Sequence, residues 1–248
     1  MTFMFGQWKK DIDAVLTRDP AAKSRLEVLL CYPGLKAIRA HRRAHRHYLK
    51  GHVLLARLIS QHARSRTGIE IHPGAQIGEG LFIDHGDGVV VGETAVIGDN
   101  VTIYQGVTLG GTGKETGKRH PNIGNGVTIG AGAKVLGPIT IGDNSKVGAG
   151  AIVLKDVPPN CTVVGNPGRV VKKKHPLKEG EVDLDQVNLP DPVQDRMEAL
   201  IERLSHLEMC LREHAKTLGC DDCVSRNSPA CPVEADRCRE ETDDMMPN

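Results

Sequence analysis

Six polar residues in the middle of this 248-residue chain have side chains suited to acid–base chemistry or to binding charged groups. They are Glu70, His72, Asp84, His85, Arg119 and His120. A neutral imidazole, with a pKa of about 6.5, is the general base available at physiological pH. A carboxylate on its other ring nitrogen fixes the tautomer and stabilises the imidazolium. The adjacent pairs Asp84-His85 and Arg119-His120 are therefore the leading candidates for a site.

These residues are embedded in a repeat of aliphatic side chains with a period of six. The repeat runs through Ile71, Ile77, Ile83 and Val89, then Val91, Ile97, Ile103 and Leu109, then Ile123, Ile129, Val135, Ile141, Val147 and Val153. This period fits neither an α-helix nor an alternating strand, but it is typical of a parallel β-helix, in which each hexapeptide forms one face of a triangular coil. Of the 28 glycines, 23 lie between Gly68 and Gly168, where they suit tight corners. Aromatic residues are only 3%, as a narrow prism requires.

Two departures from the period concern the polar pairs. The phase slips by two residues midway, and Asp84-His85 falls at a repeat corner, where both side chains can face outward. The stretch from Gly110 to Asn122, GGTGKETGKRHPN, is too polar for a coil face. We expect it to protrude as a loop that reaches across a neighbouring subunit's groove. It is not a phosphate-binding P-loop, because Thr108 and Glu115 stand where that motif has Gly and Ser/Thr.

Helical patterns flank the repeat on both sides. Residues 8–65 read as helices that cap the open N-terminal end of the prism. After the repeat, apolar residues are separated by alternating steps of four and three, which is a heptad pattern. They fall at positions 193, 197, 200, 204, 207, 211 and 218, with His214 in the remaining core position. Two interpretations stay open: a short coiled coil, since such prisms commonly form trimers, and a single amphipathic helix packed on its own prism.

The sequence thus predicts an α+β protein, with a helical N-terminal domain followed by a parallel β-helix, a C-terminal helix and a flexible tail. The expected bounds are 1–67 for the helical domain, 68–171 for the β-helix, 172–189 for a linker, 190–218 for the helix and 219–248 for the acidic tail. The tail holds Cys220, Cys223, Cys231 and Cys238. The first two have metal-ligand spacing, but no second CxxC or His partner completes a set. A reduced, disordered tail is favoured over bound zinc, and no metal is predicted.

The composition excludes several functional classes. The net charge is +1, which gives no general indication of nucleic-acid or membrane binding. No apolar run reaches about 18 residues, and the start, MTFMFGQWKKDID, lacks the apolar core of a signal peptide. We therefore expect a cytoplasmic protein with reduced cysteines.

Three stretches carry a close resemblance to a known family. They are IEIHPGAQIGEGLFIDHGDGVVVGETAVIGDNV, QGVTLGGTGKETGKRHPNIG and VVGNPGRVV. Together with the repeat they resemble serine acetyltransferase, over about residues 11–171. The resemblance implies a left-handed β-helix and transfer of acetyl from acetyl-CoA to the L-serine hydroxyl, giving O-acetyl-L-serine for cysteine biosynthesis. The short helical N-terminus is similar to the compact members, which implies a homotrimer.

The resemblance also implies roles for individual residues. His85 would be the general base for direct attack of serine on the thioester, with Glu70 as its partner carboxylate. Binding of the amino and carboxylate groups of serine would fall to Asp19, Asp84, Arg119 and His120. Acetyl-CoA, the co-substrate, would lie in a groove between two prisms, near Gly111, Ala131 and Lys146. No permanently bound cofactor is implied, and L-cysteine would be a feedback inhibitor at the serine site.

Two other functional classes share features with this chain. Gamma-type carbonic anhydrases bind zinc with three histidines across a trimer interface, and His72, His85 and His120 offer such a set. However, Arg119 beside Zn²⁺ would be repelled, and Asp84 suits an amino acid better than a metal. A binding role is the other alternative, because serine acetyltransferases dock a C-terminal isoleucine into cysteine synthase. This chain ends in Asn248, so we expect that complex to be weak, absent or relocated to the heptad helix.

Overall fold

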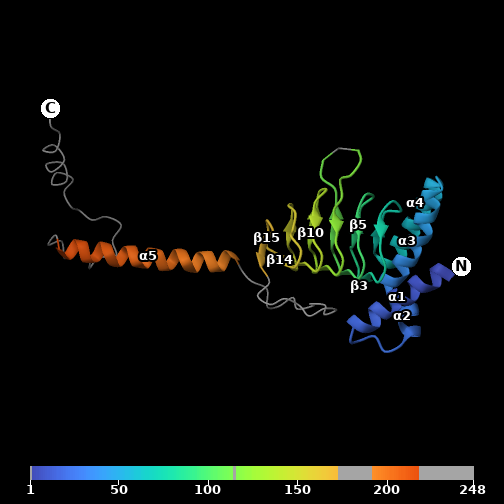
Figure 1. The fold of residues 1–248 in the computed structure, drawn as a ribbon, viewed down its shortest axis with the longest axis horizontal. Coiled ribbons are helices and arrows are strands. Elements are labelled where there is room, and N and C mark those ends of the chain that lie inside the picture. Colours follow the sequence, from blue (N-terminus) through green and yellow to red (C-terminus); the bar gives the residue numbers. More distant parts are fainter. Residues whose placement is uncertain (1, 114–115, 173–191, 218–248) are drawn as a thin grey trace. The chain divides into compact units, whose positions relative to one another are not determined.

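The computed structural model describes residues 2–113, 116–172 and 192–217. The chain divides into two units, Met1–Pro192 and Val193–Asn248. Helices α1 to α4 and a column of short strands make up the first, and helix α5 (Pro192–Thr217) occupies the described part of the second (Figure 1). No helix in these described ranges is long and apolar enough to cross a membrane. The predicted linker beyond Lys172 and the predicted cysteine-containing tail lie outside the described residues.

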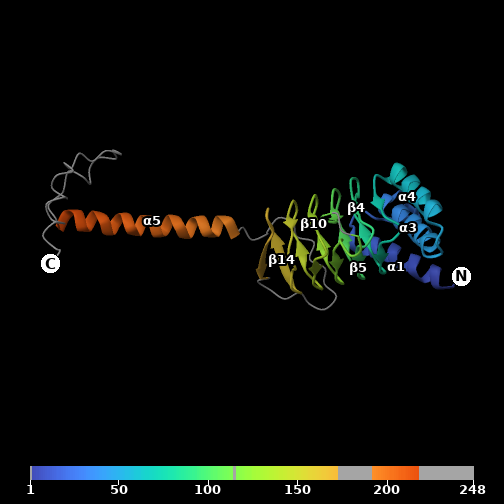
Figure 2. The ribbon, with the colours of Figure 1, turned by 90° about the horizontal axis from the view of Figure 1, so that it is seen from above.

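The strands stack into three sheets that form the faces of a left-handed parallel β-helix (Figures 1 and 2), which confirms the predicted fold class. The first sheet contains β1 (Glu70–Ile71), β4 (Val90–Val91), β7 (Thr108–Gly110), β10 (Lys134–Leu136) and β13 (Ile152–Val153). The second contains β2 (Gln76–Ile77), β5 (Val96–Ile97), β8 (Asn122–Ile123) and β11 (Thr140–Ile141). The third contains β3 (Phe82–Ile83), β6 (Thr102–Ile103), β9 (Thr128–Ile129), β12 (Lys146–Val147), β14 (Cys161–Val164) and β15 (Arg169–Lys172). All pairs are parallel except β14–β15, where the chain reverses and ends the column.

The interior of the prism is filled by the aliphatic residues of the repeat. Of the fourteen predicted inward positions, thirteen are buried and only Ile77 is partly exposed. Small residues such as Ala75, Ala95, Ala133 and Ala151 complete the same core. The predicted core of the β-helix is therefore confirmed, and the described residues that form it include no ring and no charged group.

The register of the first sheet shows where the coil changes length. Val90 pairs with Thr108, so that coil has the length expected of three hexapeptides. Glu70 pairs with Val90, so the coil that contains His85 is two residues longer than three hexapeptides. This excess matches the two-residue phase slip in the sequence. Thr108 pairs with Lys134, so a third coil is longer still, and its excess projects between β7 and β8 (Figure 1). Both predicted interruptions are confirmed as insertions at corners.

Four helices lie at the end of the column nearest β1 to β3 (Figures 1 and 2). They are α1 (Thr2–Arg18), α2 (Arg25–Cys31), α3 (Pro33–Leu49) and α4 (Val53–Thr67). The Ser24 side chain caps α2 by accepting from the Glu27 backbone N–H, and Gly68 ends α4 in the left-handed region. The predicted helical stretch over residues 8–65 is interrupted around Gly51, whose φ of +81° makes the turn between α3 and α4.

Two buried contacts attach the helices to the prism. Val15, Val28 and Leu35 pack against Phe82, which points outward from the third sheet. Asp11 is fully buried and accepts hydrogen bonds from the Arg42 guanidinium and from the Gly80 backbone N–H. Because a buried carboxylate is costly unless it is paired, these bonds fix α1 against both α3 and the first coil.

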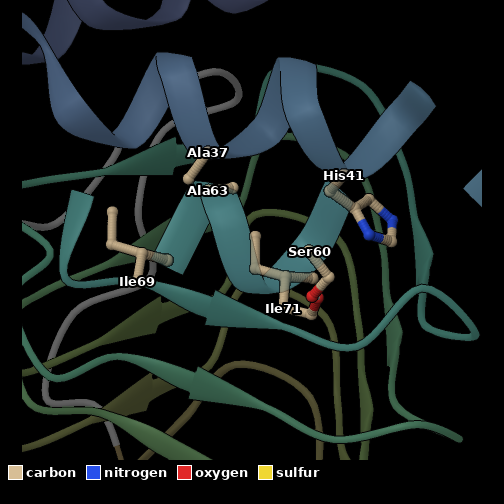
Figure 3. A pocket seen from close by; sticks show the side chains of 6 residues that line it. All are labelled: Ala37, His41, Ser60, Ala63, Ile69 and Ile71. Atoms are coloured by element: carbon tan, nitrogen blue, oxygen red, sulfur yellow. The ribbon is translucent and has the colours of Figure 1, made fainter. Parts of the chain in front are cut away.

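A small pocket lies where α3 and α4 meet β1 (Figure 3). Its lining residues are Ala37, His41, Ser60, Ala63, Ile69 and Ile71. The Ser60 hydroxyl donates to the Ile71 carbonyl oxygen at 2.7 Å, and burial lowers the pKa of His41 to about 3. His41 is therefore neutral, and the apolar lining indicates a packing junction between helices and prism.

Gly34 provides a test of how closely the helices approach the prism. A Cβ at this position would lie 2.2 Å from the Ile83 carbonyl oxygen. We expect Gly34→Ala to lower the free energy of unfolding by about 1–3 kcal/mol, because the α3 backbone must move away. Thermal and denaturant unfolding measure this, with the exposed neighbouring change Lys36→Ala as the control. Equal stability of the two variants would contradict the close approach.

Candidate active site

The first candidate pair lies in the turn that links β3 to β4, which we call the His85 corner (residues 84–89). His85 has a left-handed backbone with φ of +56°, a conformation that costs energy for a non-glycine residue. The His85 Nε2 atom lies 4.0 Å from Asp84 Oδ1. The His85 side chain is 76% exposed and that of Asp84 is 23% exposed. A single chain thus presents the imidazole to solvent beside a half-buried carboxylate.

The helical domain brings a second carboxylate to this corner. Asp19, between α1 and α2, accepts hydrogen bonds from the Tyr32 hydroxyl at 2.6 Å and from the Ala21 backbone N–H at 2.8 Å. Burial raises the pKa of Asp84, and the negative charge of Asp19 raises it further against the opposing effect of His85. Burial also raises the pKa of Tyr104, with added repulsion from Asp84 and Asp19. The two predicted carboxylates therefore share one acidic cluster, which suits a bound ammonium group.

The second candidate pair lies in the turns that link the first sheet to the second, which we call the His120 corner (residues 72–75, 92–95 and 116–121). The Arg119 Nη2 donates to Glu93 Oε2 at 2.5 Å, and the Tyr48 hydroxyl donates to Glu93 Oε1 at 2.9 Å. Both hydrogen bonds lower the pKa of Glu93, and the bond from Arg119 has the larger effect. The ion pair leaves further guanidinium N–H groups of Arg119 for a ligand.

Thr94 holds both residues of this second pair. Its hydroxyl oxygen accepts from the backbone N–H groups of Arg119 and His120, each at 3.1 Å. The His120 Nδ1 accepts from the Thr94 backbone N–H at 3.2 Å and lies 2.9 Å from the Thr94 hydroxyl oxygen. Because Nδ1 accepts a hydrogen bond, the proton of the neutral ring is on Nε2. Burial, aided by Arg119, lowers the pKa of His120, so the ring is a neutral donor through Nε2.

Two glycines make room for the His120 ring. A Cβ on Gly92 would lie 1.9 Å from His120 Cδ2 and 2.0 Å from Nε2. A Cβ on Gly111 would lie 3.1 Å from Arg119 Cγ and 3.3 Å from His120 Nε2. Any larger residue at Gly92 would occupy the position of the ring, so the ring orientation depends on this glycine.

The two corners lie at opposite ends of β4, and one chain does not bring the two pairs together. Glu70, the predicted partner of His85, forms an ion pair with Arg64 instead, with 3.1 Å between Arg64 Nη1 and Glu70 Oε2. His72 belongs to the His120 corner, where its ring meets the Tyr48 ring edge-on at 5.8 Å. Among the described residues, no group of three or more His, Cys, Asp or Glu is placed to hold a metal ion.

The residues predicted to meet acetyl-CoA are spread over three places. Gly111 is exposed at the start of the projecting segment. Ala131 lies in the turn after β9, stacked in the same column of turns as the His85 corner, and its carbonyl oxygen accepts from the Gly150 N–H. Lys146 lies on the outer side of the third sheet and is only 2% exposed. In this column of turns, nothing lies within 4 Å of a Cβ built on Gly132 or Gly150, so the surface there is open.

Several residues of both corners were not singled out from the sequence. They are Tyr32, Tyr48, Glu93, Thr94 and Tyr104. Tyr32 lies between α2 and α3, Tyr48 lies in α3 and Tyr104 follows β6, so no local pattern links the tyrosines to a candidate pair. Glu93-Thr94 occupies the same place in its coil as Pro73-Gly74 does in the preceding coil. That alignment was the only feature of the sequence that could have pointed to Glu93 and Thr94.

Comparisons with known proteins identify the family of this chain. A family described as "Bacterial transferase hexapeptide (six repeats)" matches residues 120–155. A serine acetyltransferase of Bacillus subtilis (strain 168) is 56% identical over 214 residues, which cover 86% of this chain and 98% of that protein. One from Mycobacterium tuberculosis (strain H37Rv) is 52% identical over 205 residues, covering 83% of this chain and 88% of the other.

Solved structures agree with the sequence relatives. Serine acetyltransferase of Neisseria gonorrhoeae in complex with serine has a TM-score of 0.67 and 48% identity, covering 68% of this chain and 69% of the other. The Brucella abortus strain S19 enzyme in complex with coenzyme A has a TM-score of 0.68 and 48% identity, covering 69% of each chain. By the extent and level of these identities, the chain belongs to the serine acetyltransferase family.

Proposed function

We propose that this protein transfers the acetyl group of acetyl-CoA to the hydroxyl of L-serine, giving O-acetyl-L-serine and CoA. The observation that carries the proposal is the meeting of Asp19 and Asp84 beside the exposed imidazole of His85. The relatives named serine acetyltransferase, and the solved relatives in complex with serine and with coenzyme A, support the same substrates. A cytoplasmic location is part of the proposal, because the reaction needs a supply of acetyl-CoA.

The active site is completed by a neighbouring copy in a homotrimer. The ammonium-binding carboxylates and His85 lie at one corner, whereas the carboxylate-binding Arg119 and neutral His120 lie at the other. An amino acid carries both charges, so it needs both corners. When three prisms pack around a threefold axis, the His85 corner of one subunit faces the His120 corner of the next. The groove between these corners excludes water from the His85 imidazole, which is exposed in a single chain.

Within this groove, the chemistry is a direct transfer. Asp19 and Asp84 bind the serine ammonium, and the free N–H groups of Arg119 with the Nε2–H of His120 bind its carboxylate. His85 takes the hydroxyl proton as the serine oxygen attacks the thioester carbonyl. The tetrahedral intermediate collapses, the C–S bond breaks, and the imidazolium returns the proton to the CoA sulfur. Glu70 orients the base after releasing Arg64, since an ion pair with a 56% exposed Arg64 side chain contributes little to stability.

Acetyl-CoA follows the open column of turns beside Ala131, Gly132 and Gly150. Because these positions lack bulky side chains, an extended ligand can approach the backbone closely. Gly111 reaches this groove from the neighbouring subunit's projecting segment. Lys146 would need to leave its buried position to meet the ligand. L-cysteine, bound in one solved relative, competes for the serine site because it carries the same ammonium and carboxylate.

The decisive experiment is thiol release from acetyl-CoA with and without L-serine, in the presence of a chelator. We expect serine-dependent release that falls roughly 10²- to 10⁴-fold in His85→Ala, because the general base is lost. His62→Ala, which removes an exposed imidazole from α4, should keep full activity. Release that does not depend on serine, or that the chelator abolishes, would refute the proposal.

Thr94 should control binding of serine through the His120 corner. In Thr94→Val, the Arg119 and His120 N–H groups lose their acceptor and Nδ1 loses a hydroxyl partner, so we expect the KM for serine to rise about tenfold. Thr94→Ser keeps the hydroxyl and is the matched control. Initial rates over a range of serine concentrations measure the effect. If the Val and Ser variants have the same KM, the hydroxyl does not position this corner.

Gly92→Ala should act by displacing the His120 ring. We expect the single variants Gly92→Ala and His120→Ala to lose similar fractions of kcat/KM. The double variant should be no worse than either, since removal of the imidazole leaves space for the new methyl group. Steady-state kinetics of the four proteins complete the cycle. Losses that multiply in the double variant would show that Gly92 acts independently of His120.

A further inference from the structure

Helix α5 carries a continuous apolar stripe that the activity does not use. The stripe, here called the heptad stripe, consists of Val193, Met197, Leu200, Leu204, Leu207 and Leu211. Their side chains are between 49% and 69% exposed. A long helix with such a stripe normally buries it against a partner, because isolated helices are marginal in water. The question is which partner fits.

The spacing of the stripe favours another helix. Steps of four and three give an average period of 3.5, which keeps one seam facing a supercoiled neighbour. With Met197, Leu204 and Leu211 at a positions, the d positions are Val193, Leu200, Leu207 and His214. Ile201, at an e position, is 58% exposed and widens the apolar surface beyond the seam. A wider surface suits more than two strands.

The charges beside the seam favour parallel copies of the same helix. Arg203 occupies a g position and Glu208 the e position five residues later. In a parallel coiled coil, these two positions meet between neighbouring chains, so each interface gains an opposite-charge pair. An antiparallel arrangement would instead place g residues together, including Arg196 and Arg203, and like charges would repel. This single charge pair therefore favours a parallel arrangement of identical helices over an antiparallel one.

We propose that the heptad stripe binds the α5 helices of two further copies of this chain, forming a parallel three-stranded coiled coil. The number of strands rests on the homotrimer proposed above, whose threefold symmetry also requires parallel helices. The coiled coil provides a second attachment between subunits, separate from the packing of the prisms. It keeps the three chains together when the protein is dilute, and the active-site grooves need neighbouring chains.

Cross-linking of the full chain tests the seam directly. In a parallel coiled coil, the d positions of neighbouring helices lie side by side, so Leu207→Cys should form an interchain disulfide under oxidation by diamide. Met209→Cys, at an outward f position on the same turn, should give no more cross-linked dimer than the wild type, which retains the native cysteines. Equal cross-linking of Leu207→Cys and Met209→Cys would overturn the proposal, as expected if α5 packs on its own prism or stays single.

Hydrogen exchange of the intact protein provides a second test. We expect the α5 amides of the wild type to exchange at least about tenfold more slowly than in Leu204→Asp, because a charge in the seam opens the coiled coil. Met209→Asp should leave the rates unchanged, and unchanged exchange in the prism shows that each variant is folded. Equal α5 rates in the wild type and Leu204→Asp would refute the seam. Neither test depends on catalysis. The thiol-release experiment tests the proposed activity by itself, so a failure of the activity can be told apart from a failure of the coiled coil.

Discussion

The narrow interior of the β-helix is the constraint on which the rest of the structure depends. Each coil closes a triangle whose centre accepts only aliphatic and small side chains, and parallel backbone pairing stacks one coil on the next. No charged group can be accommodated in that interior without a partner. Chemistry is therefore excluded from the core and is confined to the corners and to segments that leave the coil. The two coils that exceed the length of three hexapeptides are those that carry the candidate pairs.

The helical domain adds what the prism cannot provide. The repeat offers Asp84 at its corner, but a second carboxylate comes from Asp19, which lies between α1 and α2. Its position depends on the contacts that fix these helices, in particular buried Asp11 with Arg42 and the packing around Phe82. The Tyr32 hydroxyl then orients the Asp19 side chain. The contacts that stabilise the helical domain therefore also set the geometry of the acidic cluster.

The electrostatic properties of the two corners are complementary. At the His85 corner, burial and mutual repulsion raise the pKa of Asp84, which a bound ammonium would relieve. At the His120 corner, the Arg119 guanidinium lowers the pKa of Glu93 and burial keeps His120 neutral. The ammonium of an amino acid suits the acidic His85 corner, and its carboxylate suits the His120 corner. Because β4 separates the corners within a chain, the site proposed above requires the prisms of neighbouring copies to bring the two corners together.

The sequence by itself determined the β-helix, its inward residues and the two interruptions, because a period of six leaves few alternative structures and each inward position tolerates few residue types. It also identified Asp84-His85 and Arg119-His120 by residue type, and the resemblance supplied Asp19. Only the tertiary structure showed that Asp19 joins Asp84, that Glu70 pairs with Arg64, and that Thr94 sets the tautomer of His120. These contacts join residues from separate coils and from the helical cap. Their geometry depends on coil stacking and helix docking, which no local spacing in the chain encodes.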